Sequence, residues 1–145
     1  MTLEKFVDNL PIPKVLKPKF IKNCLDYYEI TMKEVMQKLH RDLPKTKVWG
    51  YNGTYPGPTI EARSYEGILV KWLNDLPINK HILPVDTTIH GAEPCSPRVR
   101  TVTHLHGGKV PPKSDGYPEA WFTRNFSEVG PSFDRKIYYY PNRQQ

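Results

Sequence analysis

The sequence is poor in the features that mark zinc-binding, dithiol or membrane-spanning proteins. It contains only two cysteines, Cys24 and Cys95, which lie far apart and form no Cys-x-x-Cys pair, so neither a zinc site nor a redox dithiol is indicated. The sequence leaves open whether they are free thiols or a disulfide. No run of about eighteen apolar residues occurs, so we expect neither a transmembrane helix nor a membrane partner.

The amino terminus lacks the pattern of a secretory signal. The stretch Met1–Asp8 contains acidic residues and no apolar core region. Signal peptides need a continuous apolar region of several residues, which this stretch does not provide. We therefore expect the chain to be synthesised in the cytoplasm without a signal peptide.

Concentrated charge is missing as well. The formal net charge is +6, but the lysines and arginines are scattered singly among acidic residues and form no basic run. We interpret them as a solvated surface and expect no nucleic-acid partner. A basic binding module is the weakest of the functional hypotheses.

Proline, by contrast, is abundant, with 15 among 145 residues. This is about twice the usual share and argues against long helices and for short strands joined by turns. The length fits one domain of ordinary size. Strand-like runs separated by turn signals are typical of an antiparallel sandwich or barrel, and they occur at Val48–Tyr51, Thr59–Arg63, Ile68–Asn74 and Asp134–Tyr140.

The first forty residues are less regular. Residues 1–26 contain several prolines and are predicted to form an extended arm on the body of the protein, with at most a short helix at Leu3–Leu10. The stretch Tyr27–Leu39 is ambiguous. Some of its apolar residues alternate, as in a strand, and others recur at the wider spacing of a helical face. Periodicity alone leaves both interpretations open.

A long loop with many prolines is predicted from Ile78 to Arg98. It contains His81 and His90, and neither has a partner at the spacing of metal ligands. We expect both to be ordinary surface histidines.

The strongest chemical signal is the stretch Thr101–Gly108, in which a β-branched run ends in two histidines and two glycines. Side chains alternate between the faces of a strand, so His104 and His106 would point the same way. Their Cα atoms would lie about 6.6 Å apart, which suits two neighbouring metal ions better than one. An isolated His-x-His pair is more often the polar face of a strand, but the glycines, which permit close backbone approach, favour the metal hypothesis.

Several separated motifs resemble the amino-terminal domain of the multicopper oxidases, and most closely the spore-coat laccases. They are His104–Gly108 (HLHGG), residues 52–60 (NGTYPGPTI), 114–122 (SDGYPEAWF) and 138–142 (YYYPN). The resemblance covers essentially the whole chain. It implies an all-β, cupredoxin-like Greek-key sandwich or barrel, with residues 27–145 as a partial first domain that is incomplete at its C-terminal edge, and it favours a strand after Tyr27.

The resemblance also implies a chemistry. Enzymes of this family oxidise phenols or bilirubin-like pigments by single electrons and reduce dioxygen to water at a trinuclear copper cluster held by four His-x-His motifs, of which this chain contains one. By resemblance His104 binds the type 2 copper, His106 binds a type 3 copper, and Asp115 relays protons to reduced oxygen. From its residues alone, Asp115 would be a surface residue of a turn. Copper is thus the expected cofactor, only partly liganded by this chain, and the chain alone is expected to be inactive.

The partners implied by the resemblance are the remaining domains of the same oxidase, dioxygen, an aromatic substrate and other proteins of the spore coat. Neither Cys24 nor Cys95 matches the cysteine that binds the type 1 copper of the family. The alternative hypothesis, from another functional class, is a structural piece of the spore coat without functional copper.

Overall fold

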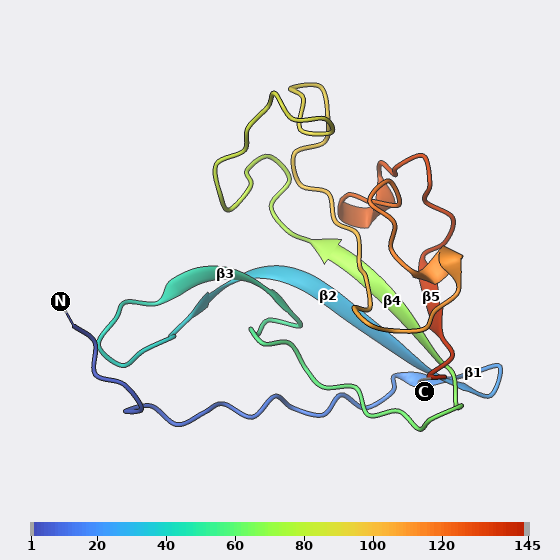
Figure 1. The fold of residues 1–145 in the computed structure, drawn as a ribbon, viewed down its shortest axis with the longest axis horizontal. Helices are drawn as coiled ribbons and strands as arrows, with labels where there is room; N and C mark the ends of the chain where they lie inside the picture. The colour runs from blue at the N-terminus through green and yellow to red at the C-terminus, as the bar shows by residue number, and fades with distance from the viewer. Residues whose placement is uncertain (1, 144–145) are drawn as a thin grey trace.

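The computed structural model describes residues 2–143, and its regular structure is almost entirely β-strand (Figure 1). The two helical elements are single 3-10 turns, and neither is long or apolar enough to cross a membrane. The elements in chain order are β1 Phe20–Lys22, β2 Leu25–Gln37, β3 Thr46–Tyr51, β4 Ile68–Asp75, η1 Pro112–Ser114, η2 Arg124–Phe126 and β5 Ile137–Tyr140. The all-β prediction is confirmed.

All five strands belong to one curled sheet, an open half-barrel organised around the long strand β2. The order is β1-β2-β4-β5, and β3 pairs with β2 as well. β2 and β4 run parallel, from Asp26 opposite Ile68 to Lys33 opposite Asp75, whereas every other pair is antiparallel. The sheet is therefore mixed and not antiparallel throughout, because residues 52–67 carry the chain back along the sheet before β4 begins.

The ambiguous stretch after Tyr27 is a strand, as the resemblance favoured. Tyr28, Ile30 and Met32 are buried, while the residues between them are partly exposed. This is the period of two that a half-buried strand requires, and it excludes the helical interpretation. The strand ends at Gln37, where a hairpin loop leads to β3.

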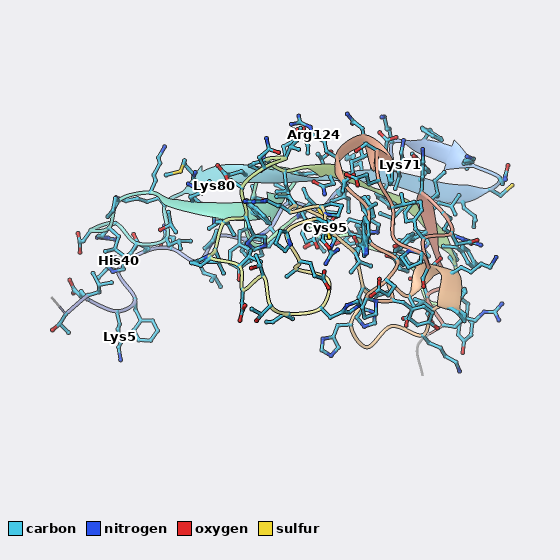
Figure 2. All side chains as sticks on the ribbon, turned by 90° about the horizontal axis from the view of Figure 1, so that it is seen from above. Lys5, His40, Lys71, Lys80, Cys95 and Arg124 are labelled. Atoms are coloured by element: carbon cyan, nitrogen blue, oxygen red, sulfur yellow. The ribbon has the colours of Figure 1, made fainter. Side chains whose placement is uncertain are left out.

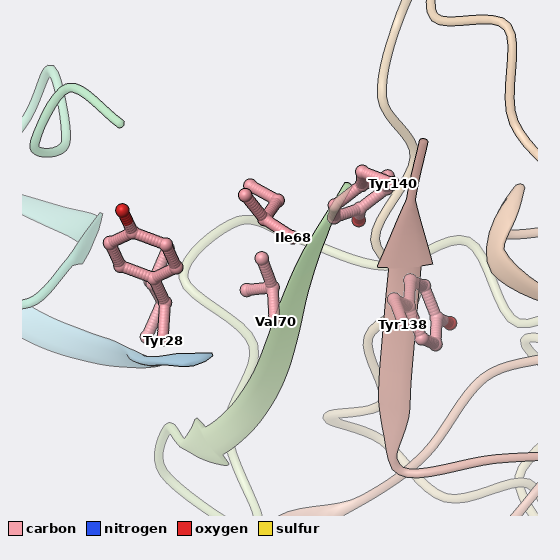
Figure 3. Close-up of a cluster of buried hydrophobic side chains, with 6 residues drawn as sticks. Tyr28, Ile68, Val70, Tyr138 and Tyr140 are labelled. Atoms are coloured by element: carbon pink, nitrogen blue, oxygen red, sulfur yellow. The ribbon is translucent and has the colours of Figure 1, made fainter. Parts of the chain in front are cut away.

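The main core lies on one face of β2, β4 and β5 (Figure 3). Its buried members are Tyr28, Ile30, Ile68, Val70, Tyr138 and Tyr140. Trp72 packs against this cluster and donates a hydrogen bond from its indole Nε1 to the Tyr140 hydroxyl at 3.0 Å. The tyrosines of β5 therefore act as core residues, and burial raises the pKa of the Tyr140 phenol well above its ordinary value.

One predicted strand, Thr59–Arg63, does not form. Only Thr59 makes a β-bridge, in parallel with Val15 of the arm. The Leu16 amide donates to the Thr59 carbonyl at 2.7 Å, and the Thr59 amide donates to the Lys14 carbonyl at 2.9 Å. The segment pairs with the arm over one residue and not with the sheet, so it lacks the ladder that makes a strand.

The arm forms no helix at Leu3–Leu10, where the sequence allowed at most a short one. Phe6 has a φ of +61°, which a right-handed helix does not allow. The arm contacts the body through the Asp8 carboxylate and the Arg41 guanidinium, 3.2 Å apart. Figure 2 shows Lys5 and His40 at the same end of the molecule, where the His40 ring bonds the Glu4 carbonyl. The last part of the arm, β1, pairs with β2 of the body. The division of the chain at residue 26 stays a prediction.

Candidate metal centre

His104 lies on an extended segment and not on a β-strand, and His106 lies in the turn that follows, which corrects the strand prediction. Thr101 exchanges two backbone hydrogen bonds with Phe122, at 3.0 and 2.8 Å. Among residues 2–143, this isolated bridge is the only β-pairing that the segment makes. A turn closed by the Gly108 amide and the Leu105 carbonyl follows directly. A run of β-branched residues becomes a strand only where a neighbour supplies a ladder, and one bridge is not a ladder.

The two imidazoles are neighbours. Their ring centroids lie 6.1 Å apart, with the ring planes inclined by 45°. Both side chains are exposed, whereas Thr103, immediately before them, is buried. The segment therefore presents the two rings outward from a buried anchor.

The orientation of the His104 ring is fixed by backbone. Its Nδ1 lies 2.5 Å from the carbonyl oxygen of Asp115. A carbonyl oxygen can only accept, so Nδ1 carries the proton and donates it. The other ring nitrogen, Nε2, then keeps its lone pair, which is the form of imidazole that binds a metal.

Gly116 makes this contact geometrically possible. Its φ is +77°, and a Cβ atom at this position would lie 2.0 Å from the carbonyl oxygen of Thr103. The turn that contains η1 ends at Asp115, whose amide donates to the Pro112 carbonyl at 3.2 Å. Only glycine lets this turn press against the backbone that carries His104.

The carboxylate of Asp115 is close to the same ring. Its Oδ1 lies 3.5 Å from His104 Nδ1, and the side chain is about one third exposed. The carboxylate is therefore near enough to the ring to interact with it electrostatically and is partly open to solvent. Its role as a proton relay stays a prediction.

The ligand set provided by residues 2–143 is incomplete. No group of three or more histidine, cysteine, aspartate or glutamate side chains in this range is arranged to hold a metal ion. Two neutral imidazoles are donors that suit copper, but a copper site needs further ligands. The donors present therefore fit copper as part of a shared site.

The other candidate residues lie apart from the histidine pair. The His81 ring packs edge-on against Trp49, with 4.7 Å between ring centroids. His90 pairs with the carboxylates of Glu93 and Glu119, at 3.3 and 3.7 Å. Both cysteines are free thiols at exposed positions, which answers the question left open by their spacing.

Sequence reasoning missed a cavity beside His104. It has a volume of about 360 Å³, and Thr103, Trp72 and Tyr140 contribute to its walls. The Thr103 hydroxyl is buried and lacks a hydrogen-bond partner among the described residues. The sequence held one signal for this cavity. Neighbouring side chains of an extended segment point to opposite faces, so an outward His104 places Thr103 inward.

Comparisons with known proteins show what the chain is similar to. A family model described as multicopper oxidase matches residues 32–94, before the histidine pair. A laccase of Bacillus stratosphericus is 59% identical over 145 residues, covering 100% of this chain and 28% of the relative. A laccase of Bacillus subtilis (strain 168) is 56% identical over 147 residues, with the same coverage of both chains.

Solved structures show the same fold. The crystal structure of a laccase from Pediococcus acidilactici Pa5930 superposes with a TM-score of 0.61 at 25% identity, over 92% of this chain and 23% of that one. A multi-copper oxidase from the same species gives a TM-score of 0.62 at 25% identity, over 92% of this chain and 22% of its own. The chain spans about a quarter of the length of the relatives it matches.

The curled, all-β sheet defines the chain as a cupredoxin-like protein. The chain belongs to the multicopper oxidase family and is similar to the bacterial laccases within it. Family membership implies copper as the cofactor.

Proposed function

We propose that this chain is the amino-terminal segment of a laccase-type multicopper oxidase and contributes two histidines to its trinuclear copper cluster. The observation that carries the proposal is the contact between His104 Nδ1 and the Asp115 carbonyl. It fixes the tautomer in which Nε2 is free to bind metal. His104 would bind the type 2 copper and His106 a type 3 copper.

The separation of the rings supports assignment to two metal ions. Centroids 6.1 Å apart place each imidazole beside a different neighbouring ion more readily than on one. When bound, the cluster would pass electrons taken from the substrate on to dioxygen and so reduce it to water. The contribution of this chain would be to hold both ligands on a segment that is anchored by the buried Thr103.

Asp115 would deliver protons to the same region. Reduction of dioxygen to water consumes protons, and a partly exposed carboxylate next to a ligand ring can pass them inward from solvent. The carboxylate and the carbonyl of this residue would then serve different purposes. The carbonyl orients His104, and the carboxylate moves protons.

The remaining ligands would come from other domains of the same oxidase. The relatives extend over about four times the length matched here, which leaves room for them. Phenols, related aromatics and bilirubin-like pigments as substrates, and the spore coat as location with other coat proteins as partners, are proposed from the resemblance of the motifs.

Oxygen uptake with a phenolic substrate tests the proposal. The copper-loaded chain alone should show no sustained turnover, because it lacks the further ligands and the copper that accepts electrons from substrate. A complete oxidase containing this segment should turn over, and His104→Ala should abolish uptake while His81→Ala, a matched change of a distant histidine, preserves it. A complete protein that is inactive and binds no copper would favour the structural alternative in the spore coat.

A further inference from the structure

The loop between β4 and the histidine segment encloses a second cavity, which we call the loop pocket. It lies between residues 79–85 and 91–100 and has a volume of about 650 Å³. Figure 1 shows this loop rising away from the end of β4. None of its lining residues belongs to the cavity beside His104. Its volume lies in the range of sites that bind small organic molecules.

Part of the lining of the loop pocket is apolar. Ile82, Leu83, Pro84 and Val85 line it consecutively and form what we call its apolar wall, and Pro94 and Pro97 line it as well. Leu83 and Val85 keep 65% and 46% of their surface exposed, so neither is used in the core. Such a surface gains free energy when a flat apolar molecule covers it.

Three cationic side chains also line the loop pocket, namely Lys80, Arg98 and Arg100. Among residues 2–143 no carboxylate forms an ion pair with any of the three. Several other lysines and arginines of the chain do form ion pairs with carboxylates. Arg98 and Arg100 thus have no carboxylate partner among the described residues, whereas Lys80 interacts electrostatically with Glu34. An anion entering it would meet an unsatisfied cation.

The only carboxylate in the lining, Glu93, is already engaged. The Ser96 hydroxyl donates to it at 2.9 Å, and His90 Nδ1 lies 3.3 Å away. Backbone amides of Gly91 and Glu93 add to these and lower the pKa of this carboxyl to about 2. Glu93 therefore stabilises the turn of its own segment and leaves Arg98 available.

Two aromatic contacts hold parts of the lining in place. The His81 ring packs against Trp49, and the Arg100 guanidinium lies 5.0 Å from the ring centroid of Trp121. Both tryptophans belong to the body of the protein and not to the loop. The pocket is consequently anchored at both ends of the loop.

We propose that the loop pocket binds an aromatic carboxylate. The ring system would lie on the wall formed by Ile82 to Val85, and the carboxylate would accept two hydrogen bonds from the exposed guanidinium of Arg98. Guanidinium and carboxylate match in this paired geometry, which a lysine cannot reproduce. A small inorganic anion would leave the apolar wall in water, so the combined surface favours an amphipathic aromatic acid.

Isothermal titration calorimetry of the copper-free chain with 2-naphthoate tests this site. The neutral amide of the same shape, 2-naphthamide, should bind about tenfold or more weakly because it cannot pair with Arg98. Arg98→Gln should weaken binding of 2-naphthoate by about tenfold and leave 2-naphthamide unaffected. Lys109→Gln removes an exposed cation outside the pocket and should change neither affinity.

A second variant examines the apolar wall. Leu83→Ser should weaken both ligands alike, since it removes contact area and no charge. Arg98 and Leu83 are both exposed, so neither change should unfold the chain, and circular dichroism verifies this. Equal affinities for acid and amide, an unchanged affinity in Arg98→Gln, or absence of binding by 2-naphthoate would each overturn the proposal. None of these results bears on copper binding by the histidine pair.

Discussion

The carbonyl oxygen of Asp115 accepts a hydrogen bond from Nδ1 of His104, 11 residues earlier in the chain, at 2.5 Å. This one contact links a turn to the histidine segment and determines which ring nitrogen can bind copper. The His104 side chain is 49% exposed, so the free nitrogen remains accessible. Because the acceptor is a backbone atom, its position depends on the turn that ends at Asp115 and on Gly116, which follows it.

That dependence gives the first prediction. Gly116→Ala should lower the free energy of unfolding by about 2 to 5 kcal/mol, because it combines a positive φ with a Cβ atom placed 2.0 Å from the Thr103 carbonyl. Gly53→Ala is the matched control, since Gly53 also has a positive φ but no atom within 4 Å of an added Cβ. It should cost only about 1 to 2 kcal/mol. Equal losses in thermal or urea unfolding would show that the turn does not press on the histidine segment.

The second prediction concerns alkaline pH. Burial, reinforced by a 3.0 Å hydrogen bond to the Glu29 carboxylate, raises the pKa of Tyr27 from 10.0 to about 12. A pKa raised on folding contributes stability that is complete below the unfolded value and is lost as pH rises through the folded value. Stability should therefore fall between pH 10 and about 12, and Tyr27→Phe should reduce this slope. A slope in the variant as steep as in the parent chain would contradict the assignment.

The third prediction follows from the open side of the sheet. The cavity beside His104 is bounded by apolar side chains, and Leu105 at its edge is 39% exposed. An exposed apolar surface of this kind tends to associate. Size-exclusion mass of the chain should rise above 16.9 kDa with concentration, and Leu105→Asn should reduce the effect more than Leu83→Asn, which lies in the loop pocket. A monomer at every concentration would show that the sheet is adequately covered.

Much of the sheet was predictable because burial determines its pattern. Tyr28, Ile30 and Met32 alternate as the inner face of β2, and the run from Ile68 is β4 almost to the residue. The parallel pairing of these two strands was not predictable, since it depends on the path of the connecting segment. The local pattern of apolar residues shows which face of a strand is buried, but it does not show which strand pairs with it.

The residues of the candidate site were singled out by their spacing and stay a prediction, whereas their local geometry was not foreseen. His104 and His106 stand out by spacing, yet their segment is no strand, because Phe122 provides only one bridge to it. The backbone carbonyl of Asp115 is closer to the ring than its carboxylate, and no side-chain pattern reports on a carbonyl. The need for glycine at position 116 likewise arises from a contact across the fold.

The most direct test of the central claim is the copper content of a complete oxidase that contains this segment, measured together with its visible and electron paramagnetic resonance spectra. His104→Ala should deplete the trinuclear copper and remove the type 2 signal, while the blue colour of the type 1 copper remains, because the two sites use separate ligands. His81→Ala should leave both intact, since His81 packs on Trp49 away from the pair. A full trinuclear complement in His104→Ala, or loss of the blue colour with an intact fold, would contradict the account.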